Sequence, residues 1–360
     1  MAFDVGEGPP PRPSPTRGEG EGCRRRLGML PFPLWGGVGG GGGAWLARLL
    51  LAAFLALAAC ASPQLQELTG IAGEASLEAD ALVMEDGVRL PLTVWAAEAP
   101  RAVIVAVHGF NGYAADFSLP GPWFAARGIS VYAYDQRGFG RHEAGRGVWP
   151  GSDRLARDLI AAVALVRGRH PKVPIHVLGF SMGGAVALKA AGQGLAADGL
   201  VLAAPAVWGW REMNPLYRVG LWSAAHIVPA QTATGSGLGI SPSDNVEWLR
   251  AYSRDPLNIG ATRFDALFGL VGLMQEAHDS AAAARLPALF VYGEKDEIIP
   301  EAPTREVLAS YGGDKRIVIY ARGWHMVLQD LQRERVWQDI LTWMTNRSAA
   351  LPSGEEAVAP

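Results

Sequence analysis

The stretch Pro174-Ile175-His176-Val177-Leu178-Gly179-Phe180-Ser181-Met182-Gly183-Gly184-Ala185-Val186-Ala187-Leu188 decides how this chain is expected to fold. Its first half is an apolar, β-type run, and its second half is rich in small residues and continues as a helical pattern. A strand is therefore expected to turn sharply into a helix at Ser181. Such a turn strains the serine backbone, so the residues two before and two after it must be small. Gly179 and Gly183 meet this requirement.

This turn would lift the Ser181 hydroxyl out of the carboxyl edge of a sheet and leave the Met182 N–H facing any bound molecule. Because the chain contains 45 glycines, the same pattern could also be a plain glycine-rich β–α turn without chemistry. The rest of the sequence has to decide between these two interpretations.

Composition indicates one large globular domain and excludes some classes of partner. The 360 residues are 49% hydrophobic and 19% charged, which is enough to bury one core of catalytic size. The formal net charge is −3, and the only basic cluster is Arg24-Arg25-Arg26, so no nucleic-acid partner is expected. Cys23 and Cys60 have no metal-type neighbours, so neither a disulfide framework, a metal site nor a cofactor is expected.

The N-terminal part does not have the composition of a folded domain. Residues 1–43 combine a proline-rich stretch with a glycine tract, and they are expected either to be disordered or to lie outside the natural protein, with translation starting at Met29. Residues 44–60 are apolar for little more than a dozen positions after Arg48, which is too short for a membrane span and typical of a signal peptide.

The end of this signal resembles the lipobox of bacterial lipoproteins. Its residues Leu57-Ala58-Ala59-Cys60 match the pattern in which the cysteine is lipidated and becomes the first mature residue. The resemblance implies an anchor at Cys60 in the bacterial cell envelope, expected on the periplasmic face of the outer membrane, with residues 61–78 as a tether. The alternative is an ordinary secretory signal in which Cys60 is incidental.

From Ala79 onward, strand and helix patterns alternate. A hairpin is expected first, and four apolar, β-branched runs follow it, separated by helical patterns. The expected strands cover residues 81–84, 88–95, 102–107, 129–134, 173–178 and 199–204. This alternation predicts an α/β fold with a mostly parallel sheet, helices on both faces and an active site at the carboxyl edge.

The alternation stops at residue 205 and resumes at residue 287. Residues 205–286 are rich in tryptophan and helical patterns and are predicted to form an inserted cap; the tryptophans form either a small core or a lipid-binding tunnel. Strands are then expected at 288–292 and 316–320, before a closing helix. The predicted core is therefore 79–204 and 287–346, and 347–360 is expected to be a loose tail.

Two further residues complete a catalytic pattern with Ser181. A serine that attacks a carbonyl needs an adjacent base, and the base must be oriented by a buried acid. Asp296 follows the expected strand 288–292, and His325 follows the expected strand 316–320. Glu294 and Glu297 flank Asp296 and are rival acids, expected to be solvated loop charges.

Residues 79–346 resemble the α/β-hydrolase superfamily, in the branch of monoacylglycerol lipases and lysophospholipases. Its catalytic residues come in the same chain order as Ser181, Asp296 and His325. The matching motifs are Gly179-Phe180-Ser181-Met182-Gly183-Gly184, His108-Gly109, Asp135-Gln136-Arg137-Gly138 and Gly293-x-x-Asp296-x-x-Ile299-Pro300. One departure is Gly138-Phe139-Gly140, where that branch usually has Gly-His-Gly.

The resemblance implies roles for the residues around the serine. The N–H groups of Phe110 and Met182 would form the oxyanion hole, and His108 would shape the oxyanion loop rather than transfer protons. Asp135 and Arg137 are expected to fix a loop as a buried ion pair.

The predicted function is hydrolysis of lipid-like carboxylic esters, such as monoacylglycerol or lysophospholipid, through an acyl-enzyme and without a cofactor. Alternatives are another carboxylesterase, an S33-type peptidase and a non-catalytic envelope lipoprotein. A peptidase would need an acidic or hydrogen-bonding pocket for a free amino terminus, and Glu212, Asp244 and Glu247 are too scattered in the sequence to support one.

Overall fold

The computed structural model describes residues 45, 48, 62–67, 73–142, 144–235, 237 and 239–357. The predictions for residues 1–43 and for lipidation of Cys60 lie outside these residues, as does nearly all of the predicted signal segment 44–60.

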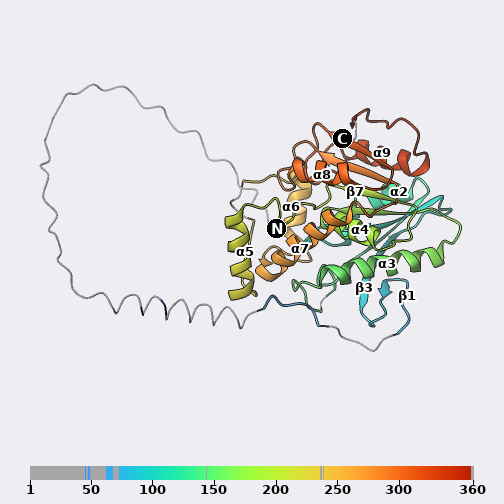
Figure 1. The fold of residues 1–360 in the computed structure, drawn as a ribbon. Coiled ribbons are helices and arrows are strands. Elements are labelled where there is room, and N and C mark those ends of the chain that lie inside the picture. Colours follow the sequence, from blue (N-terminus) through green and yellow to red (C-terminus); the bar gives the residue numbers. More distant parts are fainter. Residues whose placement is uncertain are drawn as a thin grey trace, which may run out of the picture.

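The described strands form one ten-stranded sheet and a separate two-stranded ribbon (Figure 1). The sheet order is β1-β2-β3-β5-β4-β6-β7-β10-β11-β12. Its members are β1 (Ser76–Leu77), β2 (Ala81–Val83), β3 (Arg89–Trp95), β4 (Ala102–Val107), β5 (Ile129–Tyr134), β6 (Ile175–Phe180), β7 (Gly199–Ala203), β10 (Ala288–Gly293), β11 (Lys315–Tyr320) and β12 (Glu356–Ala357). The ribbon pairs β8 (Thr232–Ala233) with β9 (Thr262–Arg263).

The six central strands, from β5 to β11 in the sheet order, run parallel, and the outer strands are antiparallel. In β4, β5, β6, β7 and β10 every residue is buried, because helices cover both faces. Alternate residues of β4 enter opposite cores: Val103 and Val105 pack on one side, and Ile104 and Ala106 on the other. The predicted fold class, a mostly parallel sheet covered on both faces, is confirmed.

Helices pack on both faces of this sheet (Figure 1). One core contains buried residues of α3, α4, α7 and α8, and the other contains those of α2 and α9. The helices are η1 (Ala114–Phe117), α2 (Pro120–Ala125), α3 (Ser152–Arg169), α4 (Met182–Gly192), α5 (Pro215–Ile227), α6 (Val246–Arg254), α7 (Phe264–Ser280), α8 (Glu301–Ser310) and α9 (Arg333–Thr345).

The segment predicted as the cap contains α5, the β8–β9 ribbon, α6 and α7. Of these, α7 packs along α4 and buries Val271, Leu273, Met274 and Ala277 in the core of the sheet. The predicted cap, residues 205–286, therefore includes α7, which also covers the sheet. Helical periodicity does not distinguish a cap helix from a covering helix, because both bury one face.

The prediction of a loose tail at 347–360 is wrong as far as Ala357. Strand β12 pairs with β11, Leu351 is buried, and the Arg316 Nε donates to Glu356 Oε1 at 2.6 Å. A two-residue strand is too short to show a periodic pattern, so the sequence gives no signal for it.

Residues 61–78, predicted to be a tether, contact the domain in the part that the structure describes, 62–67 and 73–78. The Gln66 N–H donates to the Trp149 carbonyl at 3.0 Å, and Arg263 Nη2 donates to Gln64 Oε1 at 2.6 Å. Residues 76–77 form β1, which adds to the sheet beside β2. This segment adds an edge to the fold by backbone pairing, which leaves little trace in hydrophobic periodicity.

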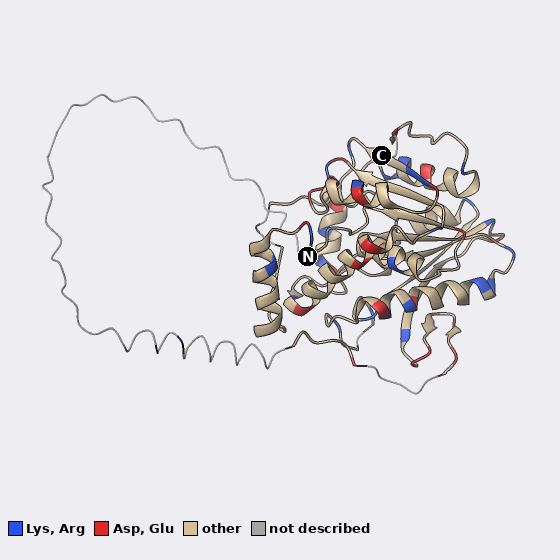
Figure 2. Cartoon of the chain, in the orientation of Figure 1, with Lys and Arg blue, Asp and Glu red and all other residues tan. Residues whose placement is uncertain are grey.

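Acidic and basic side chains are interspersed over the described part of the chain, and Figure 2 shows no broad basic face in this view. Among the described helices, none combines the length and the apolar character needed to cross a bilayer.

Candidate active site

Ser181 lies at the junction of β6 and α4, as the sequence predicted. Its backbone has φ 50° and ψ −115°, a region that non-glycine residues rarely occupy. A Cβ on Gly183 would lie 2.0 Å from the Val107 carbonyl oxygen, and one on Gly179 would lie 2.5 Å from the Gly183 carbonyl oxygen. Strand and helix can therefore approach this closely only because both positions are glycine, and the expected reason for their small size is confirmed.

Backbone strain is concentrated at one edge of the sheet. Among the described non-glycine residues, positive φ occurs at Asn111, Ser181 and Ala204, which follow β4, β6 and β7. Each such conformation costs on the order of 1–3 kcal/mol and persists only where surrounding contacts enforce it. The carboxyl edge of the central strands is therefore where the described part of the fold holds its strained backbone conformations.

Ser181, His325 and Asp296 meet at this edge in one hydrogen-bonded series. The distance from Ser181 Oγ to His325 Nε2 is 3.0 Å, and from His325 Nδ1 to Asp296 Oδ2 it is 2.8 Å. The other Asp296 oxygen, Oδ1, accepts from the backbone N–H groups of Ile298 and Ile299 at 2.8 and 2.9 Å. The carboxylate is thus fixed on both sides and orients the histidine ring toward the serine.

The series is largely withdrawn from solvent but still reachable at the serine. Ser181 is 9% exposed and His325 4%, and the Asp296 side chain is 0% exposed. The rival acids point elsewhere: Glu294 is exposed, and Glu297 Oε2 accepts from the Ser241 N–H at 2.8 Å. Of the three candidate carboxylates, Asp296 is the one hydrogen-bonded to His325.

The two predicted oxyanion-hole residues lie beside Ser181. Met182 is the first residue of α4, so its N–H is one of the helix's unpaired N-terminal donors. Gly109, which precedes Phe110, lies so close that a Cβ there would be 3.5 Å from the Ser181 Cβ. Within the described residues, neither the Phe110 N–H nor the Met182 N–H has an assigned hydrogen-bond acceptor. Two N–H groups without an acceptor among the described residues therefore lie at this edge of the sheet, one on the residue after Ser181 and one on the residue after Gly109.

His108 holds the loop that carries Phe110. It is fully buried; its Nε2 accepts from the Gln136 N–H at 2.9 Å, and its Nδ1 lies 2.8 Å from the Gly109 carbonyl. Burial lowers the pKa of His108 to about 4, partly opposed by the hydrogen bond to Gly109. A neutral ring with both nitrogens engaged shapes this loop, as expected, and is not free to transfer protons.

Two buried carboxylates that sequence reasoning missed hold the backbone beside the site. Asp116 Oδ2 accepts from the Gly109 N–H at 3.0 Å, and Asp330 Oδ2 accepts from the Trp324 N–H at 2.8 Å. Burial raises the pKa of Asp116 to about 7 and that of Asp330 to about 6, against the lowering effect of these hydrogen bonds. No motif marks either residue, because each accepts from a backbone N–H six or seven residues earlier, through the conformation of a loop.

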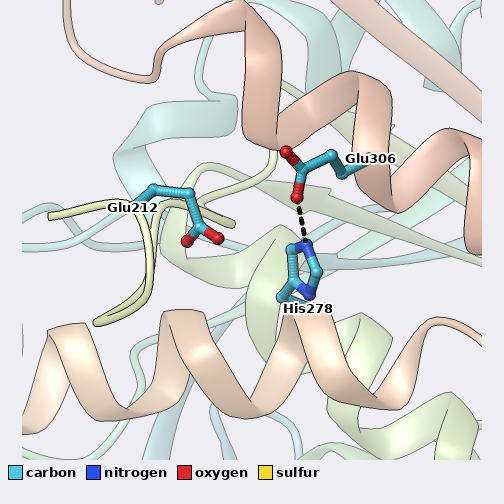
Figure 3. A group of neighbouring side chains, drawn as sticks. All are labelled: Glu212, His278 and Glu306. Carbon is cyan, nitrogen blue, oxygen red and sulfur yellow. Dashed lines mark ion pairs between the residues drawn. The ribbon is translucent and has the colours of Figure 1, made fainter.

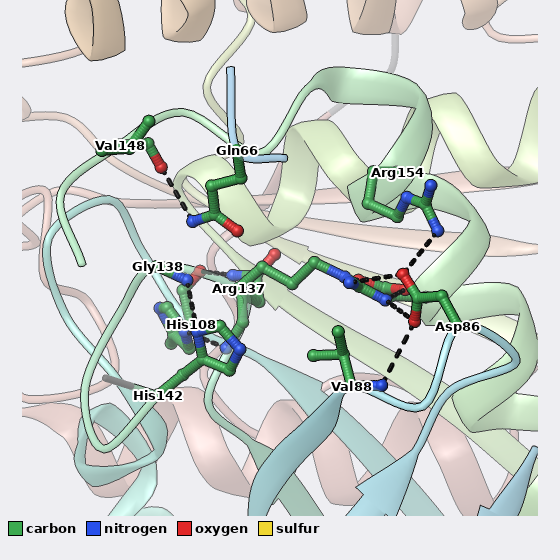
Figure 4. A network of polar contacts seen from close by, with 11 residues as sticks. Gln66, Asp86, Val88, His108, Arg137, Gly138, His142, Val148 and Arg154 are labelled. Carbon is green, nitrogen blue, oxygen red and sulfur yellow. Dashed lines mark hydrogen bonds and ion pairs between the residues drawn. The ribbon is translucent and has the colours of Figure 1, made fainter. Parts of the chain in front are cut away.

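The expected Asp135–Arg137 ion pair is wrong. Arg137 instead binds two other carboxylates. It donates to Asp158 at 2.6 and 2.9 Å, and to Asp86 at 2.8 and 2.9 Å (Figure 4). Asp135 pairs with Arg141 at 2.8 Å. Beyond the end of β5 the chain turns, so residues two apart no longer share a face and each finds a different partner.

The Phe139 departure has a structural explanation. The Phe139 ring packs edge-on against His108 and Phe110, with centroid distances of 5.6 and 5.7 Å. His142 Nδ1 accepts from the Gly138 N–H at 3.0 Å and so closes the same loop (Figure 4). An aromatic ring at position 139 therefore supports the oxyanion loop through packing.

The cap contributes apolar surface. A cavity of about 350 Å³ is lined by Trp210, Arg218, Val219, Trp222 and Phe268, from α5, α7 and the segment before α5. Trp210 and Trp222 thus line a surface pocket, while Trp208 and Trp210 also pack against one core and Trp248 against the other. Several large apolar side chains of α5 are also exposed: Leu216 (79%), Tyr217 (67%), Val219 (65%) and Trp222 (49%).

A serine on a strained strand–helix elbow, hydrogen-bonded to a histidine and through it to a buried carboxylate, is the catalytic arrangement of serine hydrolases with an α/β fold. The protein is therefore a serine hydrolase. Residues 98–332 match the model of the family described as Hydrolase_4, serine aminopeptidase S33, and the chain belongs to this family.

Individual relatives narrow the comparison. The chain is 30% identical over 268 residues to a monoacylglycerol lipase of Mycolicibacterium smegmatis, which covers 72% of this chain and 94% of that protein. It is 26% identical over 280 residues to a monoglyceride lipase of Mus musculus, covering 76% and 92%. The solved structure of a Paleococcus ferrophilus monoacylglycerol lipase superposes with a TM-score of 0.61 at 21% identity, covering 72% of this chain and 99% of that one. That structure shares the fold.

Proposed function

We propose that this hydrolase cleaves lipid-like carboxylic esters, with monoacylglycerol as the preferred class and lysophospholipid as a second one. The observation that carries the proposal is the series Ser181 Oγ, His325 Nε2, His325 Nδ1 and Asp296 Oδ2, with distances of 3.0 and 2.8 Å. It provides an activated nucleophile without a cofactor.

In the proposed reaction, His325 Nε2 takes the Ser181 proton while Oγ attacks the ester carbonyl. The N–H groups of Phe110 and Met182 bind the oxygen as it becomes negative, each contributing on the order of 3 kcal/mol to transition-state stabilisation. His325 then gives its proton to the departing alcohol, leaving an acyl-Ser181. Water, deprotonated by the same ring, releases the fatty acid, while Asp296 keeps Nδ1–H in place.

The apolar cap favours a substrate with an acyl chain. The cavity beside α5 is lined by four apolar side chains and one arginine, which suits a hydrocarbon chain better than a peptide. The relatives at 30% and 26% identity are named as monoacylglycerol and monoglyceride lipases, which supports the same class.

A substrate panel tests this proposal. We expect kcat/KM for long-chain monoacylglycerol to exceed that for a short p-nitrophenyl ester and for an aminoacyl p-nitroanilide. Ser181→Ala should abolish every activity in the panel, whereas Ser310→Ala, which changes an exposed serine on α8, should leave all of them unchanged. Faster turnover of the anilide than of any ester would replace the proposal with a peptidase.

The peptidase alternative is favoured by the description of the family model, serine aminopeptidase. It would require acidic groups that converge on the amino terminus of a peptide. The three acids considered from the sequence have separate surroundings: Asp244 Oδ1 accepts from the Leu331 N–H, Glu247 is exposed on α6, and Glu212 lies beside His278. The ester reaction is therefore the better supported of the two.

We further propose that the enzyme is anchored in the bacterial envelope, at the outer membrane, through a lipidated Cys60. The support comes from the lipobox-like sequence and from the docking of the residues after it: the Gln64 N–H donates to Asp265 Oδ2 at 3.3 Å. Gln64 lies four residues after Cys60, so at about 3.5 Å per residue the domain lies within roughly 14 Å of the anchor. Exposed apolar side chains of α5, such as Leu216, would suit a lipid surface.

Detergent phase partitioning tests the anchor. Wild-type protein should enter the detergent phase with an acylated Cys60 at its mature N-terminus. Cys60→Ser should leave the membrane fraction or accumulate as an uncleaved precursor, with unchanged activity on a soluble short-chain ester. Wild-type protein that stays in the aqueous phase without acylation would refute the anchor and leave the ester reaction untouched.

A further inference from the structure

Three metal-ligand side chains converge at a place that does not include the triad residues. Glu212 lies in the segment before α5, His278 in the last turn of α7, and Glu306 in α8 (Figure 3). One ligand atom from each lies within 4.8 Å of the others, and His278 Nε2 is 3.5 Å from Glu306 Oε2. Three elements distant in sequence thus direct an imidazole and two carboxylates toward one point.

Two of these ligand atoms are buried without a hydrogen-bond partner. Within the described residues, neither His278 Nε2 nor Glu212 Oε2 has one, although both are shielded from solvent. Leaving buried polar atoms unpaired costs free energy, so such atoms require a specific explanation. A bound cation would satisfy both atoms at once.

The charge around this point also favours a cation. Glu212, Glu306 and Asp279, whose Oδ1 lies 3.7 Å from His278 Nδ1, bring three carboxylates to the cluster. Arg211, which binds Asp279 Oδ1 at 3.1 Å, supplies one positive charge. With His278 neutral, one divalent cation would balance the two remaining negative charges.

The segment that carries Glu212 is held firmly. The Arg211 N–H donates to Gln275 Oε1 on α7 at 3.0 Å, and Arg218 donates to the carbonyls of Met213 and Arg211 at 2.7 and 2.5 Å. Just before it, Gly209 lies so close to α7 that a Cβ there would be 2.6 Å from the Gln275 Cα. A ligand on such a segment is already in place before a metal arrives, which favours binding.

We propose that Glu212, His278 and Glu306 form a binding site for Zn²⁺. One imidazole nitrogen and two carboxylate oxygens are ligands that zinc accepts, and water would complete a tetrahedron. With zinc–ligand distances of about 2.0–2.2 Å, neighbouring ligand atoms lie about 3.4 Å apart, close to the 3.5 Å between His278 Nε2 and Glu306 Oε2. Glu306, whose side chain is 58% exposed, is free to close the remaining gap.

The role of this site is structural. Zinc would fasten the chain entering the cap, through Glu212, to α7 and α8, which cover the sheet. None of the three side chains hydrogen-bonds to Ser181, His325 or Asp296 in the part of the chain described here. Zinc should therefore raise stability without changing the chemistry at the serine.

Thermal unfolding of the full chain, freed of bound metal and titrated with ZnCl₂, tests the proposal. The unfolding midpoint of wild type should rise by about 5 °C when zinc is present at about a hundred times Kd. Glu306→Gln should remove most of this rise. In equilibrium dialysis, Glu306→Gln should bind one zinc ion fewer per chain than wild type. Glu301→Gln, which changes another exposed glutamate of α8, should show the same rise as wild type. Zinc that binds elsewhere on the chain affects both variants equally, so the difference between their midpoints reports on this site alone.

Two outcomes would overturn the site. Either zinc leaves the wild-type midpoint unchanged, in which case the three side chains are an ion-pair cluster, or Glu306→Gln and Glu301→Gln respond to zinc alike. Mg²⁺ in place of Zn²⁺ should give no rise, because the imidazole ligand disfavours it. Ester hydrolysis, followed in the same samples at 25 °C, should be the same with and without zinc.

Discussion

The carboxyl edge of the sheet and helix α5 of the cap differ in how far their side chains are exposed and in how firmly these are held by hydrogen bonds. At the edge, Ser181 and His325 are 9% and 4% exposed, and each side chain is fixed by hydrogen bonds. On α5, Leu216 and Tyr217 are 79% and 67% exposed, and Trp222 lines a cavity. We propose that the two regions have separate roles: the residues at the edge carry out the hydrolysis, and the apolar surface of the cap selects the ester.

The largest expected effect comes from substituting a catalytic residue at the carboxyl edge. Ser181→Ala or His325→Ala should lower kcat by about 10⁴- to 10⁶-fold, since each removes the activated nucleophile. Asp296→Asn should cost about 10³- to 10⁴-fold, because the amide favours the wrong histidine tautomer. Steady-state kinetics on a short p-nitrophenyl ester measure these losses, and circular dichroism checks the fold.

Glu294→Gln is the matched control, since it neutralises an exposed carboxylate two residues before Asp296. It should keep wild-type activity. Wild-type activity in Asp296→Asn together with a loss in Glu294→Gln would move the catalytic acid to position 294.

A smaller effect is expected from breaking the cap. Trp222→Ala removes an aromatic wall of the cavity and should lower kcat/KM for long-chain monoacylglycerol about tenfold, the value of a few lost apolar contacts. The short ester should be hydrolysed as before, because the triad is untouched. Val246→Ala, an exposed apolar side chain of α6, should change neither rate. Equal losses for long and short esters in Trp222→Ala would contradict the separation of cap and edge.

The last effect leaves catalysis aside and concerns stability and pH. The folded pKa of Asp116, about 7, lies above its ordinary value of 3.8, because burial disfavours the carboxylate. The folded form therefore binds the proton more tightly, and the contribution of Asp116 to stability is present below about pH 4 and lost as pH rises through about 7. Relative to wild type, Asp116→Asn should gain unfolding free energy across this window, by at most about 1.4 kcal/mol per pH unit. Urea unfolding at pH 4.5, 6.0 and 7.5 measures this difference in unfolding free energy. If the unfolding free energies of wild type and Asp116→Asn change with pH in the same way, the prediction is wrong.

The catalytic edge could be predicted from the sequence because its signals are local. Gly179, Ser181 and Gly183 lie within five residues, and Asp296 and His325 each follow an apolar strand pattern. The strands themselves are continuous β-branched runs, so the parallel sheet and its covering helices follow from periodicity.

What the sequence did not reveal depends on contacts that no motif marks. The supporting carboxylates Asp116 and Asp330 accept from backbone N–H groups seven and six residues away, through loop conformations without a sequence signature. The pairing of β12 with β11, and the meeting of Glu212 with His278 and Glu306, join residues far apart in the chain. Short strands and non-local clusters leave no periodic trace, so a single sequence does not indicate them.

The central claim is that Ser181 is the nucleophile, and covalent labelling tests it most directly. The active enzyme is treated with a fluorophosphonate, digested and analysed by mass spectrometry, alongside Asp296→Asn and Glu294→Gln. The account predicts one adduct, on the peptide containing Ser181, formed at the wild-type rate in Glu294→Gln and far more slowly in Asp296→Asn. An adduct on a different serine, or full ester hydrolysis by protein whose Ser181 is completely labelled, would contradict it.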